Sequence, residues 1–416
     1  MRIAIAILGA LLCASCGGGS AGPAATDPPA AAASVPSASS AATAPAPAAP
    51  TAPAAPAAPS TSAPPSSAPS TTSGSPLYEV IEIPRLAATG SVTASAVNDQ
   101  GVVVGAQETT GADRAWMYQQ SSGALDELTL DPSELGAHPN GISNGGVITG
   151  YEVPSGGTPL PGFWTTTGGA MVLNGSYPDF TEAVAANDSG TLIGNLEQSG
   201  SVSSQPLVWT APGYAQSPLP GLACDACTRI AVTASAINGN GLIVGSSSYG
   251  IYDGSGNYVT SGLHAVSWQN GTIADLGGLQ GAQYSAASSV NDSGDVVGGS
   301  RTDQTAGAPT HAFLDHGGVM TDLGTLPGDT DSTADSINDS GEIVGESSSG
   351  SASHAFLYQN GRMVDLNSLL DPASALAGRV SLQEAVSISA NGWIAVNGTD
   401  SRDPGWTRAF LLIPAH

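Results

Sequence analysis

Residues 337–366 read INDSGEIVGESSSGSASHAFLYQNGRMVDL, and this stretch contains two β-hairpin patterns. In the first, Asn338-Asp339-Ser340-Gly341 separates two Ile/Val-containing runs. Asn or Asp opens such a turn, and Gly takes the left-handed position that a type I turn with a G1 bulge requires. In the second, alternating apolar residues flank Asn360-Gly361, a favoured two-residue hairpin turn. The stretch therefore predicts two hairpins, or four strands.

The first hairpin pattern recurs seven times after residue 76. It reads as a small residue, any residue, Ile or Val, and then Asn-x-x-Gly-x-x-x-Gly. In the clear copies we predict structural turn roles for the Asn and the first Gly, which are Asn98 and Gly101, Asn187 and Gly190, Asn238 and Gly241, Asn291 and Gly294, and Asn338 and Gly341. Two weaker copies have Ser143 and Ser389 in place of the Asn. The final positions of successive copies are 45, 44, 51, 53, 47 and 51 residues apart, which indicates a repeat architecture.

Four strands in about 48 residues match one blade of a β-propeller. We therefore predict that residues 77–416 form an all-β, seven-bladed propeller, with an open β-repeat solenoid as the alternative. The two ends of this region are complementary, because residues 77–83 resemble the strand after an Asn-Gly turn and residues 409–413 resemble the strand before it. Pairing of these two segments would close the ring and hide both edges, whereas a solenoid would need capping repeats.

The second hairpin begins with a recurring His-Ala dipeptide at His264, His311 and His354. Together with the Thr-Asp-Leu-Gly-Thr-Leu segment at 321–326 and the Asn-Asp-Ser-Gly turns, these strands resemble the bacterial extracellular HAF-repeat proteins. The resemblance covers roughly residues 77–416 and is closest over 264–366. It implies an exported location, and it brings no established activity and no catalytic residues.

The N-terminus has the pattern of an export signal. Arg2 precedes the apolar stretch Ile3–Leu12, which is too short for a permanent membrane span and is typical of a signal-peptide core. The following Leu-Cys-Ala-Ser-Cys resembles a bacterial lipobox, although Leu12 lies one position earlier than usual. We predict a lipoprotein signal peptide over 1–16 with lipidated Cys16, the alternative being an ordinary signal peptide cut nearby. Residues 17–76, almost entirely Gly, Ala, Pro, Ser and Thr, predict a disordered linker.

The net charge of −25 limits the classes of partner. The chain contains no lysine, and the region after residue 76 carries 33 acidic residues and 8 arginines. Such a surface repels phosphate backbones and anionic lipids, so we expect no nucleic-acid binding and membrane contact only through the lipid anchor. The expected partners are a glycan or an envelope or surface protein, and we expect a monomer. The location follows as outer membrane or cell surface, because Gly17 is not the Asp that retains lipoproteins in the inner membrane; secreted or periplasmic is the alternative.

Several residue sets invite a chemical interpretation. Cys224 and Cys227 predict a local disulfide, with free thiols, a redox pair or a metal site as alternatives. His264, His311 and His354 recur once per unit, with Arg114 and Arg408 in equivalent places, and we expect them to make blade-to-blade hydrogen bonds instead of a metal site. We expect the turn aspartates to serve the hairpin turns and not to bind calcium; these are Asp99, Asp188, Asp292 and Asp339. We expect the recurring tryptophans to lie in the core between blades; these are Trp116, Trp164, Trp209 and Trp268.

The function that follows is a non-enzymatic surface module for display or binding, with no cofactor, metal or catalytic residue. The alternative is a propeller-type hydrolase or lyase acting on polysaccharide, with acids and arginines in the central funnel. The arginines are few and scattered, at positions 85, 114, 229, 301, 362, 379, 402 and 408. Convergence of three or more of them with a carboxylate pair in one cleft would favour the enzyme.

Overall fold

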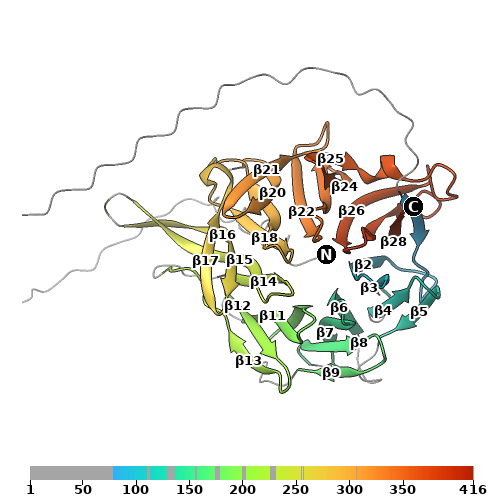
Figure 1. The fold of residues 1–416 in the computed structure, drawn as a ribbon, viewed down its shortest axis with the longest axis horizontal. Helices are drawn as coiled ribbons and strands as arrows, with labels where there is room; N and C mark the ends of the chain where they lie inside the picture. Colours follow the sequence, from blue (N-terminus) through green and yellow to red (C-terminus); the bar gives the residue numbers. More distant parts are fainter. Residues whose placement is uncertain are drawn as a thin grey trace, which may run out of the picture. The chain divides into compact units, whose positions relative to one another are not determined.

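Seven four-stranded antiparallel sheets are arranged in a ring in the computed structural model (Figure 1). The structure describes residues 78–109, 113–128, 136–154, 157–173, 179–198, 203–224, 231–253, 255, 257–305 and 307–415. The predicted seven-bladed β-propeller is confirmed, and the open solenoid is excluded. Within the described residues no helix is long and apolar enough to cross a bilayer. The predicted signal peptide, Cys16 and the linker lie outside the described residues.

The strands follow one another from the axis of the ring outward in each of the first six blades. Blades 1 to 3 comprise β2 (Val92–Val97), β3 (Val102–Gln107), β4 (Arg114–Gln119) and β5 (Ala124–Glu127); β6 (Gly136–Ile142), β7 (Val147–Val153), β8 (Leu160–Thr165) and β9 (Ala170–Val172); and β10 (Thr181–Ala186), β11 (Thr191–Gln198), β12 (Ser203–Thr210) and β13 (Ala215–Pro218). Blades 4 to 6 comprise β14 (Val232–Ile237), β15 (Ile243–Tyr252), β16 (Tyr258–Gln269) and β17 (Thr272–Gly277); β18 (Ser285–Val290), β19 (Val296–Arg301), β20 (Thr310–His316) and β21 (Val319–Gly324); and β22 (Asp331–Ile337), β23 (Ile343–Ser349), β24 (Ala352–Gln359) and β25 (Arg362–Asp365).

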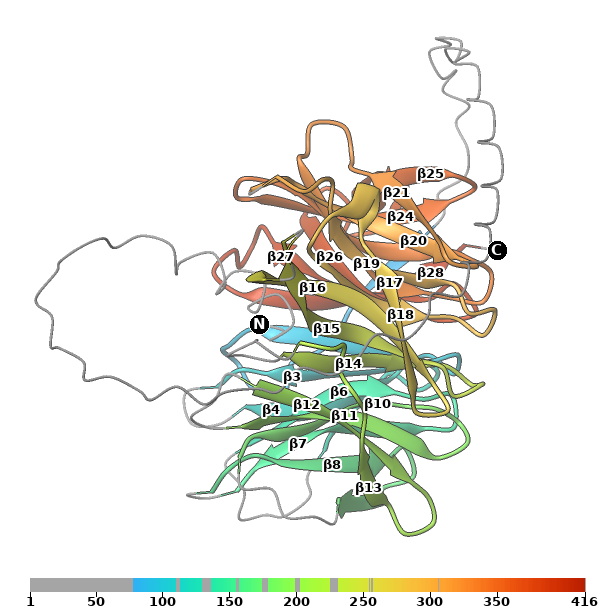
Figure 2. The same ribbon diagram turned by 90° about the vertical axis from the view of Figure 1, so that its left-hand side faces the viewer.

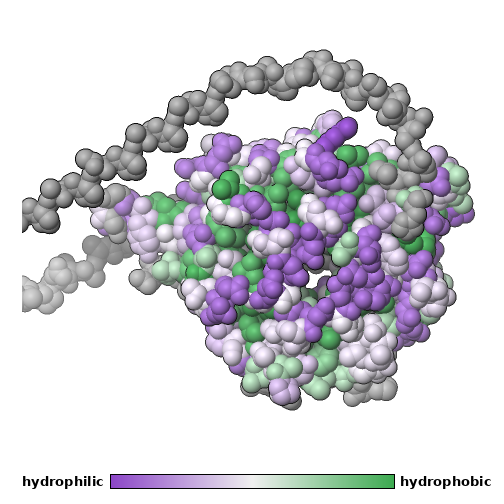
Figure 3. Space-filling view, in the orientation of Figure 1, coloured by the Kyte–Doolittle hydropathy of each residue, from purple (hydrophilic) through white to green (hydrophobic). Residues whose placement is uncertain are grey.

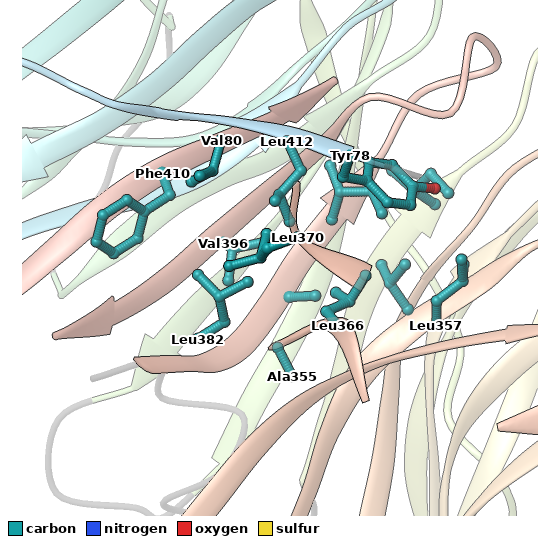
Figure 4. Close-up of a cluster of buried hydrophobic side chains, with 14 residues drawn as sticks. Tyr78, Val80, Ala355, Leu357, Leu366, Leu370, Leu382, Val396, Phe410 and Leu412 are labelled. Atoms are coloured by element: carbon teal, nitrogen blue, oxygen red, sulfur yellow. The ribbon is translucent and has the colours of Figure 1, made fainter. Parts of the chain in front are cut away.

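Blade 7 closes the ring with a strand from the other end of the chain. Its order is β26 (Val380–Ile388), β27 (Ile394–Asp400), β28 (Thr407–Pro414) and then β1 (Tyr78–Glu82). The register runs from Tyr78 opposite Pro414 to Glu82 opposite Phe410. Tyr78 and Val80 are buried beside Leu412 in the core between blades 6 and 7 (Figure 4). The predicted pairing of the first and last strands is therefore confirmed, and it removes both free edges.

The last glycine of the repeat has a steric role in blades 1 to 6. The inner strand of every blade contains a β-bulge, which in blade 6 lies between Ala334 and Ser336. Gly345 on the second strand faces this bulge, and a Cβ there would lie 2.0 Å from the carbonyl oxygen of Thr333. Glycines occupy the same place in blades 1 to 5, namely Gly105, Gly150, Gly194, Gly245 and Gly298. In these six blades the approach of the two strands leaves no room for a side chain, whereas blade 7 has a second bulge between Leu382 and Glu384 and carries Val396 at this position.

Large side chains fill the spaces between neighbouring blades. Trp116, Trp164, Trp209 and Trp268 are at most 2 % exposed, and each belongs to a cluster that draws residues from two blades. Trp268 of blade 4, for example, packs with Ile193 of blade 3. This placement agrees with the expected core role of the tryptophans. Figure 2 shows the ring from the side, with β14, β15 and β16 of blade 4 toward the viewer.

Candidate functional site at the channel mouth

The turns between the first and second strands of all seven blades meet around one cavity at the axis of the ring. Its volume is about 260 Å³. Hydrophilic residues gather around the centre of the ring in the space-filling view (Figure 3). The lining includes four of the five predicted turn asparagines and all four turn aspartates, namely Asn187, Asn238, Asn291, Asn338, Asp99, Asp188, Asp292 and Asp339. The turns are therefore part of a recess as well as connections between strands.

An Asn or Ser side chain and a glycine with positive φ hold each turn. In blade 6, Oδ1 of Asn338 accepts a hydrogen bond from the backbone N–H of Glu342 at 3.0 Å. Gly341 has a φ of +77°, which a side chain would disfavour. In the weaker copies, the hydroxyl oxygens of Ser143 and Ser389 accept the equivalent backbone bond, at 3.2 Å in both cases.

The turn asparagines also join neighbouring blades, which sequence reasoning missed. The Nδ2 group of Asn338 donates to the backbone carbonyl of Ser389 in the next blade at 3.1 Å. The same bond joins Asn98 to Ser143, Asn187 to Asn238, Asn238 to Asn291, and Asn291 to Asn338. This series of amide-to-carbonyl bonds does not continue from Ser143 or from Ser389 to the next blade, because serine has no amide group to donate. The preference for Asn over Asp in five copies was the available signal, since only Asn is both donor and acceptor.

The turn aspartates form a second ring of bonds between turns. The backbone N–H of Asp292 donates to Oδ1 of Asp339 at 2.9 Å, and that of Ala390 donates to Oδ1 of Asp99 at 2.7 Å. Equivalent bonds run from Gly239 to Asp292, from Gly145 to Asp188, and from Asp99 to the side chain of Asn144. The carboxylates therefore bind backbone groups of the adjacent turn, a role beyond the local hairpin role that we expected. No group of three or more His, Cys, Asp or Glu side chains with metal-binding geometry occurs within the described residues.

A second group of titratable side chains draws its members from blades 1, 2 and 3. His138 Nε2 is 2.8 Å from Oδ2 of Asp113, and the His138 ring stacks on Tyr151 with 4.9 Å between centroids. Burial lowers the pKa of His138, and the nearby Asp113 opposes this effect. Burial also raises the pKa of Tyr151, with a further contribution from the negative charge of Glu182. No repeated motif contains these residues, so their meeting could not be predicted from the sequence.

Glu182 on the inner strand β10 is the most perturbed carboxyl of this group. Burial raises its pKa to about 7, and the hydrogen bond that Asn140 Nδ2 donates to Oε2, at 3.0 Å, opposes the rise. Glu197 adds a like charge that raises the pKa further. Glu182 is therefore divided between its neutral and charged forms near neutral pH.

The pKa of Glu182 predicts a pH-dependent effect of Glu182→Gln. Folding holds this pKa above its unfolded value of 4.5, so the wild type loses stability as pH rises from 4.5 through about 7. Glutamine cannot ionise and avoids this loss. We expect the variant to melt at a higher temperature than the wild type at pH 8, by roughly 3 °C or more, and to show a smaller difference at pH 5. Thermal unfolding followed by circular dichroism measures this, with Glu79→Gln on the exposed side of β1 as control. An equal shift at both pH values would contradict the assignment.

The recurring histidines pair with aspartates of their own blade or of the connections between blades, and not with a strand of the neighbouring blade as we expected. His264 Nδ1 lies 2.9 Å from Oδ1 of Asp275 on the adjacent strand of the same blade. His311 lies 2.9 Å from Asp322 in the same way, and His354 lies 3.1 Å from Asp329 in the loop before its own blade. In blades 4 and 5 the fourth strand places an aspartate opposite the histidine, and His264 Nε2 also lies 3.3 Å from the carbonyl oxygen of Ala282 in the connection to blade 5. In the positions equivalent to histidine, Arg114 pairs with Glu127 and Arg408 with Glu82.

Four of the scattered arginines converge beside the closing strand. Arg408 is 1 % exposed and pairs with Glu82 and Asp403, while Arg379 Nη2 lies 2.9 Å from Oδ2 of Asp400. Arg85 and Arg402 complete the network with Asp403 and Asp400. Burial would raise the pKa of Asp400, but the backbone N–H of Arg402 and the guanidinium of Arg379 hold it below its ordinary value. The network joins β1, β27 and β28 at the seam and does not line the channel cavity, so it does not favour the enzyme.

Cys224 is buried and disulfide-bonded. Its expected partner Cys227 lies outside the described residues, so their pairing stays a prediction.

Comparison with known proteins adds a partial family match. Residues 191–394 match DUF3466, described as a protein of unknown function. The DUF3466 match begins with β11 in blade 3 and ends at the start of β27 in blade 7. No curated protein matches the chain.

Solved structures with a similar ring are distant in sequence. A structure from a study of two prolyl endopeptidases is 11 % identical with a TM-score of 0.50, over 77 % of this chain and 50 % of that chain. The β-propeller domain of the Trilobed protease from Pyrococcus furiosus is 9 % identical with a TM-score of 0.49, over 78 % and 97 %. A polysaccharide lyase of family PL25, an ulvan lyase, is 12 % identical with a TM-score of 0.42, over 77 % and 93 %. At these identities the likeness concerns the fold alone.

Proposed function

We propose that the protein is an exported, lipid-anchored surface protein whose propeller is a binding or display module without catalytic chemistry. The observation that supports this proposal is the way in which hydrogen bonds fix the turns around the cavity at the axis of the ring. The Asn and Asp side chains that line it donate to, or accept from, backbone groups of neighbouring turns. A recess fixed in this way is suited to holding a ligand by shape and hydrogen bonds. The expected ligands are a glycan or an envelope or surface protein, and not a nucleic acid, because the chain carries a net charge of −25.

The anchor is predicted at Cys16, with the linker 17–76 holding the propeller away from the outer membrane or cell surface. We expect metabolic labelling with a palmitate analogue to tag the wild-type chain and to leave Cys16→Ser unlabelled. Cys13→Ser is the matched control, because Cys13 lies in the same segment and should have no effect. Equal labelling of wild type and Cys16→Ser would refute the anchor and favour a secreted or periplasmic protein.

Binding without turnover is the direct test of the module. We expect the full chain, immobilised on a sensor surface, to retain components of a bacterial envelope fraction saturably and to release them unchanged. Product analysis of the released material by mass spectrometry measures this. The appearance of shortened or unsaturated saccharides that depends on the protein would contradict a binding role.

Glu182 supports the second candidate, a polysaccharide hydrolase or lyase. A general acid works best when its pKa is near the working pH, and the pKa of Glu182 is raised to about 7. If the protein has this activity, Glu182→Gln should abolish product formation in the assay above while leaving retention of the envelope material intact.

A further inference from the structure

Blade 4 carries a hairpin that extends beyond its sheet. The neighbouring strand β14 pairs with β15 only as far as Ser247, and β17 pairs with β16 only as far as Ala265. Beyond these points β15 and β16 continue to pair with each other up to Tyr252 opposite Tyr258. We call residues 249–252 and 258–262 the arm. It projects from the ring at the left of Figure 1.

The end of the arm exposes large apolar side chains. Tyr252 is 45 % exposed, Tyr258 is 39 % exposed and Val259 is 60 % exposed. These are three of the seven exposed large hydrophobic side chains found among the described residues. The two tyrosine rings contact each other edge to face, with centroids 5.9 Å apart and planes at 75°. An exposed aromatic pair at the tip of a projecting hairpin indicates a contact surface.

Glycines hold the tyrosine rings of the arm against its backbone. A Cβ on Gly250 would lie 2.7 Å from Cε2 of Tyr252, and a Cβ on Gly262 would lie 2.4 Å from Cε1 of Tyr249. Each ring therefore occupies the space that a side chain would take. This arrangement fixes the orientation of the Tyr252 ring before a ligand arrives, which lowers the entropic cost of binding.

The size of the patch favours a small contact over a protein interface. A stable protein interface buries about 800 Å² on each partner. An aromatic side chain contributes at most about 150–250 Å², and Tyr252 and Tyr258 are less than half exposed. Two rings and one valine fall well short of that area. They match the contact of one or two sugar rings.

The charge of the arm favours an uncharged ligand. Residues 249–252 and 258–262 contain no charged side chain, and the nearest carboxylate, Asp253, accepts hydrogen bonds from Ser255 and Asn257 in the loop. The net charge of −25 repels acidic polymers. We propose that Tyr252 and Tyr258 form a stacking platform for a neutral glycan. This inference rests on the proposed binding function, specifies its ligand class, and adds a contact on blade 4 that is separate from the recess at the axis of the ring.

Calorimetric titration of the full chain with three neutral probes, cellohexaose, laminarihexaose and mannohexaose, tests the platform. We expect at least one to bind the wild type, and Tyr252→Ala or Tyr258→Ala to weaken its binding about tenfold, which corresponds to about 1.4 kcal/mol. Tyr252→Phe should retain most of the affinity, because the ring that stacks is kept. Gly250→Val should weaken binding because its side chain displaces the Tyr252 ring. Trp406→Ala, which removes a 39 % exposed aromatic away from the arm, should have no effect.

Failure of the platform and failure of the binding function give different results. The platform is overturned if no neutral probe binds the wild type. It is also overturned if the double variant that combines Tyr252→Ala with Tyr258→Ala binds as well as the wild type. In either case retention of envelope material by the same double variant still supports the binding module. Absence of envelope retention in the wild type would instead remove the proposed function. Melting curves of each variant, compared with the wild type, identify losses caused by unfolding.

Discussion

Deletion of residues 77–85 is expected to open the ring and to unfold the propeller as a whole. The deletion removes β1, whose five residues pair with β28, together with Ile83, which is 1 % exposed and donates its N–H to Ala409. It also removes Glu82, the partner of the buried Arg408. An unpaired edge, a cavity beside Leu412 and the loss of one of the two carboxylate partners of Arg408 then arise together at the seam.

Hydrogen exchange measures the extent of this loss. We expect protection to disappear first from β26, β27 and β28 and then from all blades, with aggregation through the exposed edge. Deletion of 17–76 is the control, because no described strand lies in that segment, and its melting temperature should stay within a few degrees of the wild type. Persistent protection in β26–β28 after deletion of 77–85 would show that closure by β1 is dispensable.

Gly345→Ala is expected to have the second largest effect, a loss of about 3 kcal/mol in the free energy of unfolding. The new Cβ would lie 2.0 Å from the carbonyl oxygen of Thr333 and 3.0 Å from the ring of Phe356. The carbonyl belongs to the bulged inner strand and the ring is fully buried, so neither can move without breaking strand pairs or core packing.

Chemical denaturation measures this loss, which corresponds to a fall of roughly 5–10 °C in Tm. Gly405→Ala is the matched control, because no atom lies within 4 Å of its Cβ position, and it should be close to neutral. A similar small effect for both substitutions would mean that the bulge relaxes to accept a side chain.

The sequence contained enough information for the fold because each feature repeats or pairs within a short span. Asn338 and Gly341 define one turn, Asn360 and Gly361 define another, and seven copies at a regular period leave few architectures. Closure was also predictable, because residues 77–83 resemble the strand after an Asn-Gly turn and residues 409–413 resemble the strand before it. The longest interval between copies, 53 residues from Gly245 to Gly298, contains the arm of blade 4.

Individual hydrogen bonds and ion pairs between residues on different blades were not predictable from one sequence. The amide of Asn291 binds the carbonyl of Asn338, 47 positions away, only because the ring places consecutive turns side by side. Arg379 and Glu82 meet for the same reason, since closure brings the two ends of the chain together. His138, Tyr151 and Glu182 belong to no motif, and their perturbed pKa values come from burial that only packing produces.

Because the ring is closed by an outermost strand, the chain ends could lie at another place in the ring without a change in the order of the blades around it. Tyr78 lies opposite Pro414, so a short peptide could join residue 415 to residue 78 without crossing the ring. Circular permutants of the propeller could then begin in any loop between blades, for example between β13 and β14, and would keep all seven sheets. The present order is therefore one of several that the same ring can accommodate.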